Sequence, residues 1–214
     1  LVRGCRLDAP VAGSFSDNLI DRSAGTVIEA CRIEGAQRMI ELAAPVSAGF
    51  NIIRNDPRFT TTRLAGNLIV ASYFDASILW VGDDTSEPVF GSRTGTFEMH
   101  HNTVIVSTGA FQSHVPNVSA SMTVDFRHNI VRATGAEIIQ ILDDAGTLVR
   151  GVNWLSPGWQ PSPTGTISGT ANILTTAGNN PQLDAGFVPL SDSPCRAAAP
   201  ALLVAWQFQD PVGA

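Results

Sequence analysis

The stretch that decides the fold is TFEMHHNTVIVSTG, residues 94–107. Apolar and polar residues alternate in it, so Phe97 and Met99 share one face of a strand. A second alternating run follows and includes Val104, and its apolar residues are out of phase with the first run by one residue. The chain must therefore bend near Asn102, and Asn tolerates the left-handed conformation that a tight corner needs. Two short strands joined by a corner are predicted.

The same pattern recurs along the chain as a hexamer: an apolar residue, two small or polar residues, Cys or Asn, any residue, and an apolar residue. Its copies are VRGCRL (2–7), IEACRI (28–33), LAGNLI (64–69), MHHNTV (99–104), FRHNIV (126–131) and VRGVNW (149–154), the last with Val152 in the Cys/Asn position. IIRNDP (52–57) fits in a competing phase and stays an alternative copy. Spacings of 26, 36, 35, 27 and 23 residues between successive Cys/Asn positions are typical of a solenoid with variable loops.

The hexamers are predicted to be strands, because they are rich in β-branched and apolar residues and bounded by Gly, Pro, Ser or Asp. Several are followed by a second short apolar run, namely MIEL (39–42), ILWV (78–81) and IIQIL (138–142). Two or three short strands per repeat predict an all-β fold, a parallel β-helix.

Coils of this solenoid are expected over residues 1–155, with longer excursions at 8–18, 43–62, 82–95 and 107–120. Residues 156–214 are expected to be an extended loop and a C-terminal capping segment of the same domain, since residues 154–170 are rich in Pro, Gly, Ser and Thr. Leu1 lies inside a copy of the repeat. Because an open solenoid end needs cover, we expect a missing N-terminal portion, or another chain over the first coil.

With these repeats the chain resembles the right-handed parallel β-helix superfamily that includes the pectate lyases and other polysaccharide-active proteins. The resemblance runs through residues 1–155 and continues in NPQLDAGFVPLSDSPC (180–195), which is similar to the closing segment after the last coil of such proteins. It implies a right-handed helix, a polysaccharide partner, and an extracellular or periplasmic location. The motifs of pectate lyases, polygalacturonases and DPHE-type alginate epimerases are not evident in the sequence.

Stacking of the coils at about 4.8 Å lets the Asn side chains form hydrogen bonds along the solenoid as a ladder. Cys5 and Cys31 occupy the same column one coil earlier. Neighbouring coils bring their Cα atoms within the range of a disulfide, but free buried thiols are the expected state of the cysteines.

Composition excludes several function classes. The chain is 44% apolar and 15% charged, which is typical of a folded domain. A net charge of −6 argues against nucleic acid or an anionic membrane surface as a partner. All 13 basic residues are Arg, so the Lys base of the alginate-lyase and chondroitinase-B type of β-helix enzyme is missing. No apolar run reaches the roughly 18 residues of a membrane helix.

Outward-facing polar residues of neighbouring coils are predicted to stack in columns. Arg63, Glu98 and Asp125 share one column; the adjacent column holds Arg3, Glu29, Ala65, His100 and Arg127; at the corner His101 stacks on His128. We select Glu98, His100, Asp125 and Arg127 as candidate catalytic residues, and Arg63, His101, His128 and Trp80 as candidate substrate-binding residues.

Two chemistries suit this patch. Glu98 and Asp125 can act as acid and base on a glycosidic bond. Alternatively, Arg127 neutralises a uronate while a histidine abstracts the C5 proton. A solvated face of cross-strand ion pairs is the competing interpretation. His100 and His101 are not expected to act together, since neighbours on a strand point to opposite faces.

The other candidate groups are weaker. The acidic pairs Asp83-Asp84 and Asp143-Asp144 each follow an apolar strand and suit Ca²⁺ or a turn; no other cofactor and no metal site are expected. Three tryptophans can stack on sugars: Trp80, Trp154 and Trp159. The leading hypothesis is a polysaccharide lyase or glycoside hydrolase that binds a glycan along a sheet face. The alternative is a non-catalytic structural or adhesive β-helix, such as a surface-binding or tailspike-like module.

Overall fold

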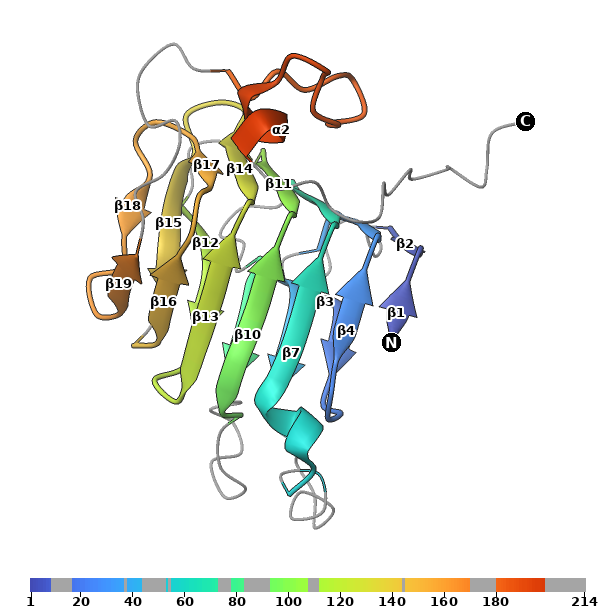
Figure 1. The fold of residues 1–214 in the computed structure, drawn as a ribbon, viewed down its shortest axis with the longest axis vertical. Coiled ribbons are helices and arrows are strands. Elements are labelled where there is room, and N and C mark those ends of the chain that lie inside the picture. The colour runs from blue at the N-terminus through green and yellow to red at the C-terminus, as the bar shows by residue number, and fades with distance from the viewer. Residues whose placement is uncertain are drawn as a thin grey trace.

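Three parallel sheets run along the molecule and wind into a right-handed parallel β-helix, as the sequence predicts (Figure 1). The structure is a computed structural model. It describes residues 1–8, 17–36, 38–43, 53, 55–72, 78–82, 93–107, 112–143, 145–169 and 180–198. Among these residues no helix has the length and apolar character needed to cross a membrane.

Each coil contributes one strand to each sheet, and neighbouring strands pair in parallel. Sheet A consists of β1 (Val2–Arg3), β4 (Val27–Glu29), β7 (Thr61–Ala65), β10 (Gly95–His100), β13 (Met122–Arg127), β16 (Thr147–Arg150) and β19 (Thr166–Gly169). Sheet B consists of β2 (Arg6–Leu7), β5 (Arg32–Glu34), β8 (Leu68–Ala71), β11 (Thr103–Val106), β14 (Ile130–Ala133) and β17 (Trp154–Leu155). Sheet C consists of β3 (Asp17–Asp21), β6 (Arg38–Ala43), β9 (Leu79–Gly82), β12 (Gln112–Val118), β15 (Ile138–Asp143) and β18 (Gln160–Pro161).

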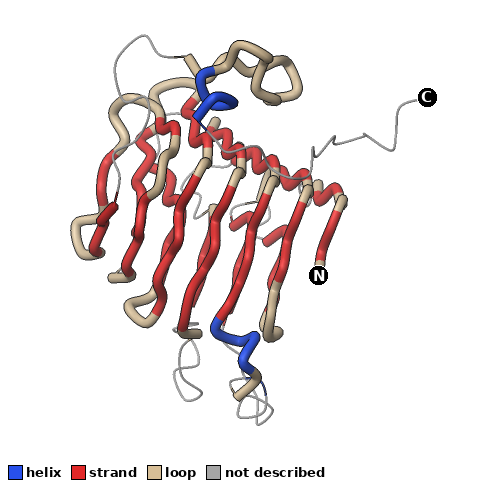
Figure 2. Tube along the Cα trace, viewed as in Figure 1, coloured by secondary structure: helices blue, strands red, loops and turns tan. Residues whose placement is uncertain are grey.

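The described helical segments are short and lie outside the coils. The 3₁₀ helix η1 (Pro57–Thr60) precedes β7, and the helix α2 (Pro194–Ala198) follows the last strands (Figure 2). The chain turns from sheet A to sheet B within two residues, or three between β16 and β17, and the connections elsewhere are longer or equal in length.

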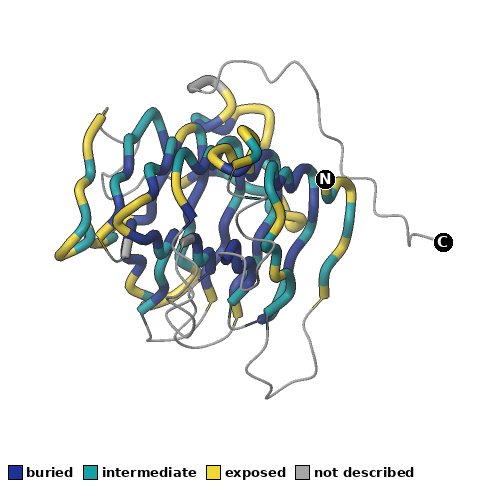
Figure 3. Tube along the Cα trace, turned by 90° about the horizontal axis from the view of Figure 1, so that it is seen from below, coloured by how far each residue is buried: buried dark blue, intermediate teal, exposed yellow. Residues whose placement is uncertain are grey.

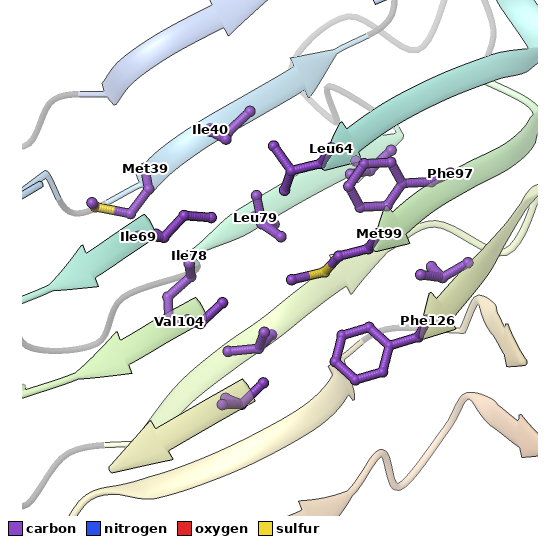
Figure 4. Close-up of a cluster of buried hydrophobic side chains, with 14 of the residues drawn as sticks. Met39, Ile40, Leu64, Ile69, Ile78, Leu79, Phe97, Met99, Val104 and Phe126 are labelled. Carbon is purple, nitrogen blue, oxygen red and sulfur yellow. The ribbon is translucent and has the colours of Figure 1, made fainter. Parts of the chain in front are cut away.

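The core lies between the three sheets and is made of the apolar residues that each strand turns inward. Phe97, Met99 and Phe126 of sheet A are fully buried and face Leu79 of sheet C and Val104 of sheet B (Figure 4). Exposed segments lie on the outside of the coils and in the connections (Figure 3). This burial confirms the alternation read in residues 94–107 and fixes which residues of sheet A point outward.

The corner between sheets A and B differs from the prediction in one respect. The left-handed residue is not Asn but the residue before the Cys/Asn position, with φ of 62° at Gly4, 52° at Ala30, 64° at Gly66, 56° at His101 and 56° at His128. The Asn that follows turns its side chain along the helix axis instead. It thereby satisfies the backbone groups that the corner leaves without sheet partners.

The predicted asparagine ladder is present, but its last member is Asn153 and not Val152. Asn67 Nδ2 donates to Asn102 Oδ1 at 2.9 Å, and Asn102 Nδ2 donates to Asn129 Oδ1 at 3.0 Å. Asn129 Nδ2 donates to Asn153 Oδ1 at 3.1 Å. Residues 149–151 share the sequence VRG with residues 2–4, which suggested that the last hexamer begins at Val149. It begins at Arg150 instead, because Arg150 pairs with Phe126, the first residue of the preceding hexamer.

Two further expectations on loops were wrong. The excursion expected at 107–120 contains β12, a strand that pairs with both β9 and β15. It was missed because Pro116 argues against a strand in sequence. The coils also continue beyond residue 155, since β18 pairs with β15 and β19 pairs with β16.

The C-terminal segment lies against the side of the solenoid. Cys195 of α2 packs with Leu183 against Ile130 and Trp154 of sheet B. The expected cap over the end of the last coil is therefore not what residues 180–198 form. They cover outward-facing apolar residues of sheet B near β14 and β17 (Figure 1).

Candidate functional site

Sheet A presents a row of charged residues on its outward side, and its register confirms the predicted columns. Arg63 pairs with Glu98, and Glu98 pairs with Asp125. In the next column Ala65 pairs with His100, and His100 pairs with Arg127. We call the outward residues of β7, β10 and β13 the charged face: Arg63, Glu98, His100, Asp125 and Arg127.

The closest contacts of the charged face are centred on Asp125. Its Oδ2 lies 3.1 Å from His100 Nε2, and its Oδ1 accepts a short hydrogen bond from Arg127 Nε. His100 Nε2 is buried and its angle to Asp125 is not that of a hydrogen bond; catalytic contacts are often loose before substrate binds. Asp125 therefore lies within contact distance of both His100 and Arg127, and it holds Arg127 through Nε.

Arg127 owes its position to a glycine on the next coil. A Cβ at Gly151 would lie 2.7 Å from Arg127 Cγ, so the side chain of Arg127 lies across Gly151. Any side chain at this position would displace it. The Arg127 side chain is 50% exposed, which leaves the guanidinium accessible to a ligand.

A second ion-pair cluster continues the row toward the N-terminus. Glu29 is almost buried and lies 2.5 Å from Arg3 and 3.6 Å from Arg63 Nε. Glu98 stands between the two clusters. Within the described residues its carboxylate makes no ion pair or hydrogen bond, although it lies beside Asp125 in register. The charged face thus combines the Asp125 carboxylate, which is paired with Arg127, with the Glu98 carboxylate, which is unpaired among the described residues.

His101 and His128 stack at the corner beside the charged face. Their ring centroids lie 4.8 Å apart at 28°, which confirms the predicted stacking. Burial, and then the charges of His128, His100 and Arg63, lower the pKa of His101 to about 4. Burial also lowers the pKa of His128, with smaller effects from His100 and Arg127. The charge of His100 thus contributes to the lowered pKa of both histidines of the stack.

This stack predicts that acid destabilises the protein. The pKa of His101 falls from 6.5 in the unfolded chain to about 4 in the fold. Its contribution to the free energy of unfolding is therefore fully present above pH 6.5, where the ring is neutral in both states. That contribution is lost as the pH falls toward 4, because the unfolded chain takes up the proton first. After discounting for partial exposure we expect a loss of about 1 kcal/mol from His101. Urea denaturation of wild type and His101→Asn between pH 7.5 and 4.5 checks this, because Asn tolerates the left-handed corner. Equal pH dependence in the two proteins would contradict it.

The structure does not bring every candidate to the charged face. Trp80 belongs to β9 of sheet C, where the guanidinium of Arg38 lies 4.7 Å from its ring centre. Trp154 is 3% exposed and packs under α2, so it offers no surface for a sugar. Trp159 is partly buried against the core, with Arg150 over its ring at 5.8 Å.

A row of threonines beside the charged face was missed. Five threonines of sheet A pair in register on consecutive strands: Thr61, Thr96, Thr123, Thr147 and Thr166. They place hydroxyl groups at strand spacing along the outward side of five coils. The signal in sequence was a threonine two residues before Arg63, Glu98 and Asp125.

Within the described part of the chain, no group of three or more His, Cys, Asp or Glu side chains is placed to hold a metal ion. The acidic pairs 83–84 and 143–144, considered for Ca²⁺, lie outside the described residues except for the backbone of Asp143 in β15. The three cysteines Cys5, Cys31 and Cys195 are free thiols, as expected.

Comparison with known protein families, with curated proteins and with solved structures gives no match for this chain. The protein is therefore described by its fold and by the side chains on its surface. It is a right-handed parallel β-helix with a row of charged and hydroxyl side chains across one sheet.

Proposed function

We propose that this protein binds a uronic-acid polysaccharide across the charged face of sheet A and cleaves it by β-elimination. The observation that carries the proposal is the contact of Asp125 with both His100 and Arg127 on an exposed sheet surface. The proposal places the chain with the polysaccharide-active, pectate-lyase-like β-helices. A polymer of this kind lies outside the cytoplasm, so we also propose an extracellular or periplasmic location.

His100 acts as the base in the proposed reaction. Asp125 faces its Nε2, so Nδ1 takes the C5 proton of the uronate. The electron pair of that C–H bond forms the C4–C5 double bond, the glycosidic C4–O bond breaks, and the departing oxygen takes a proton from water. Removal of the C5 proton requires the uronate charge to be neutralised, and this is the role of Arg127 and Arg63.

The threonine row and the net charge define how the polymer binds. Hydroxyls of Thr96 and Thr123 lie beside the charged residues and suit hydrogen bonds to sugar hydroxyls. Because the chain carries a net charge of −6, a polyanion is attracted to it locally, through the arginines of the charged face. Binding should therefore weaken as salt rises.

One observation favours a second reaction, hydrolysis. Glu98 and Asp125 are neighbours on paired strands, and strand spacing of about 4.8 Å is near the 5–5.5 Å between carboxyl groups of retaining glycosidases. Asp125 is held by Arg127 while Glu98 is unpaired among the described residues. In this scheme Asp125 is the nucleophile and Glu98 the acid.

A panel of uronic-acid and neutral polysaccharides separates these functions by their products. Elimination gives an unsaturated sugar that absorbs in the ultraviolet, whereas hydrolysis gives reducing ends without that absorption. We expect His100→Ala to lower turnover of a uronic-acid polymer at least about 100-fold, because general bases contribute ~10²–10⁴. We expect Arg127→Ala to raise KM as well, and Glu98→Gln to leave elimination unchanged.

Arg196→Ala is the matched control, because Arg196 is an exposed arginine of α2 away from the charged face. Full activity of the His100→Ala and Arg127→Ala proteins would remove the charged face as the site. Hydrolysis that is lost in Glu98→Gln would replace elimination by the second reaction. Binding without turnover in every assay would support the non-catalytic, adhesive alternative.

A further inference from the structure

We propose that Cys5 and Cys31 are a reversible redox pair, whose disulfide fastens the first coil of the solenoid to the second. Both residues occupy the Cys/Asn position of the corner, and the strands on either side of them pair in register. Arg3 pairs with Glu29 before the corner, and Arg6 pairs with Arg32 after it. Cys5 therefore lies directly opposite Cys31, in the corners between paired parallel strands whose spacing of about 4.8 Å suits a disulfide.

The asparagine ladder shows which way the Cys31 side chain points. Each ladder side chain reaches toward the preceding coil: Asn67 Nδ2 donates to Ile28 O, and Asn102 Nδ2 donates to Leu64 O. Cys31 makes the corresponding contact, with its Sγ 3.8 Å from Val2 O. Its sulfur is therefore directed at the first coil, at the level of Cys5.

The two thiols differ in access to solvent. Burial raises the pKa of the Cys31 thiol, and the neighbouring Cys5 thiol raises it further. Cys31 is 1% exposed, whereas Cys5 is partly exposed. An oxidant from solution must therefore react first at Cys5, and Cys31 then serves as the resolving thiol.

The chemistry requires a disulfide oxidant, for which oxidised glutathione is suitable. The Cys5 thiolate attacks one sulfur of glutathione disulfide, which forms a mixed disulfide and releases one glutathione. Cys31 sulfur then attacks the sulfur of Cys5, and a second glutathione leaves. The protein loses two protons and two electrons, and these reduce the oxidant to two glutathione thiols.

The bond would hold two of the short strands of the described residues. In the first coil β1 and β2 are two residues long, and each has one described strand partner. Opening of such a strand does not require the rest of the coils to unfold. A bond across the corner would join β1 and β2 to β4 and β5, so that the first coil opens only together with the second.

The test is to incubate the reduced protein with oxidised glutathione and to digest it with trypsin without reduction. Cleavage at arginine places Cys5 in residues 4–6, Cys31 in residues 23–32 and Cys195 in residues 151–196. We expect the 4–6 and 23–32 peptides to be joined, and the intact protein to lose two hydrogens. Hydrogen exchange of the amides in residues 2–7 should slow about tenfold on oxidation.

Cys31→Asn is the matched variant, because it installs the residue that the next four coils use at this position. It should fold, lack the cross-link and retain glutathione on Cys5. Cys195→Ser should still form the cross-link. A stable glutathione adduct on wild-type Cys5, a bond to Cys195, or a bond between two protein molecules would overturn the proposal.

Discussion

Asn102→Ala is expected to destabilise the protein by about 3 kcal/mol, since truncation leaves buried polar groups without partners. Asn102 is 1% exposed. Its Oδ1 accepts from Asn67 N at 3.0 Å and from Asn67 Nδ2 at 2.9 Å, while its Nδ2 donates to Leu64 O at 2.9 Å. The alanine variant offers neither an acceptor nor a donor in their place. Urea denaturation measures the loss as a lower midpoint.

Two further variants serve as controls for this measurement. Asn180→Ala removes an asparagine from an exposed turn and should change stability by less than about 0.5 kcal/mol. The double variant Asn67→Ala/Asn102→Ala should cost less than the sum of the single variants, because both remove the hydrogen bond from Asn67 Nδ2 to Asn102 Oδ1. An additive double variant, or an Asn102→Ala protein as stable as Asn180→Ala, would contradict a cooperative ladder.

The sequence was sufficient to predict the solenoid because its core and its corners repeat. The alternation around Phe97 and Met99 and the recurrence of Asn at one corner are local patterns, and each coil repeats them with only its neighbours as partners. The predictions failed where the local pattern conflicts with tertiary contacts. Pro116 lies in a strand. Val152 follows the same VRG sequence as Cys5 does, but the register places Asn153 at the Cys/Asn position.

The candidate site was predictable to the level of its columns. Once the hexamers were aligned, the pairing of Glu98 with Asp125 and of His100 with Arg127 followed from parallel register. Which partners a side chain selects within a column did not follow. Asp125 contacts His100 and Arg127, whereas Arg63 leans toward Glu29 and leaves Glu98 unpaired among the described residues. Such choices depend on rotamers and on neighbours in the adjacent column.

Arg93 had no signal in the sequence, yet it is the largest fully buried side chain among the described residues. Its Nη1 donates to Thr62 Oγ1 at 3.0 Å, and its Nη2 donates to Ser23 O at 2.9 Å and Ala43 O at 3.4 Å. Its guanidinium lies 5.0 Å from the ring centre of Phe59. One arginine therefore joins segments from three coils at the end of sheet A opposite the asparagine ladder.

Arg93→Met is expected to cost about 3–5 kcal/mol, because it removes one partner of a buried polar network and leaves the others unpaired. Burial lowers the pKa of Arg93, and the charge of Asp21 opposes that effect. Removal of the cation therefore also removes a favourable charge interaction with the Asp21 carboxylate. Arg93→Lys keeps the charge but not the forked donors, and it should fall between wild type and Arg93→Met in denaturation midpoint.

Arg58→Met is the matched control, since Arg58 lies in η1 near the same end of the solenoid and its side chain is 76% exposed. Its ion pair with Asp56 is in solvent, so the midpoint should stay close to that of wild type. A second test is the double variant Arg93→Met/Asp21→Asn, which also removes the charge of the Asp21 carboxylate. It should recover part of the stability that Arg93→Met loses. If Arg93→Met is no less stable than Arg58→Met, then apolar packing alone holds these coils together, and the hydrogen bonds of Arg93 add no stability.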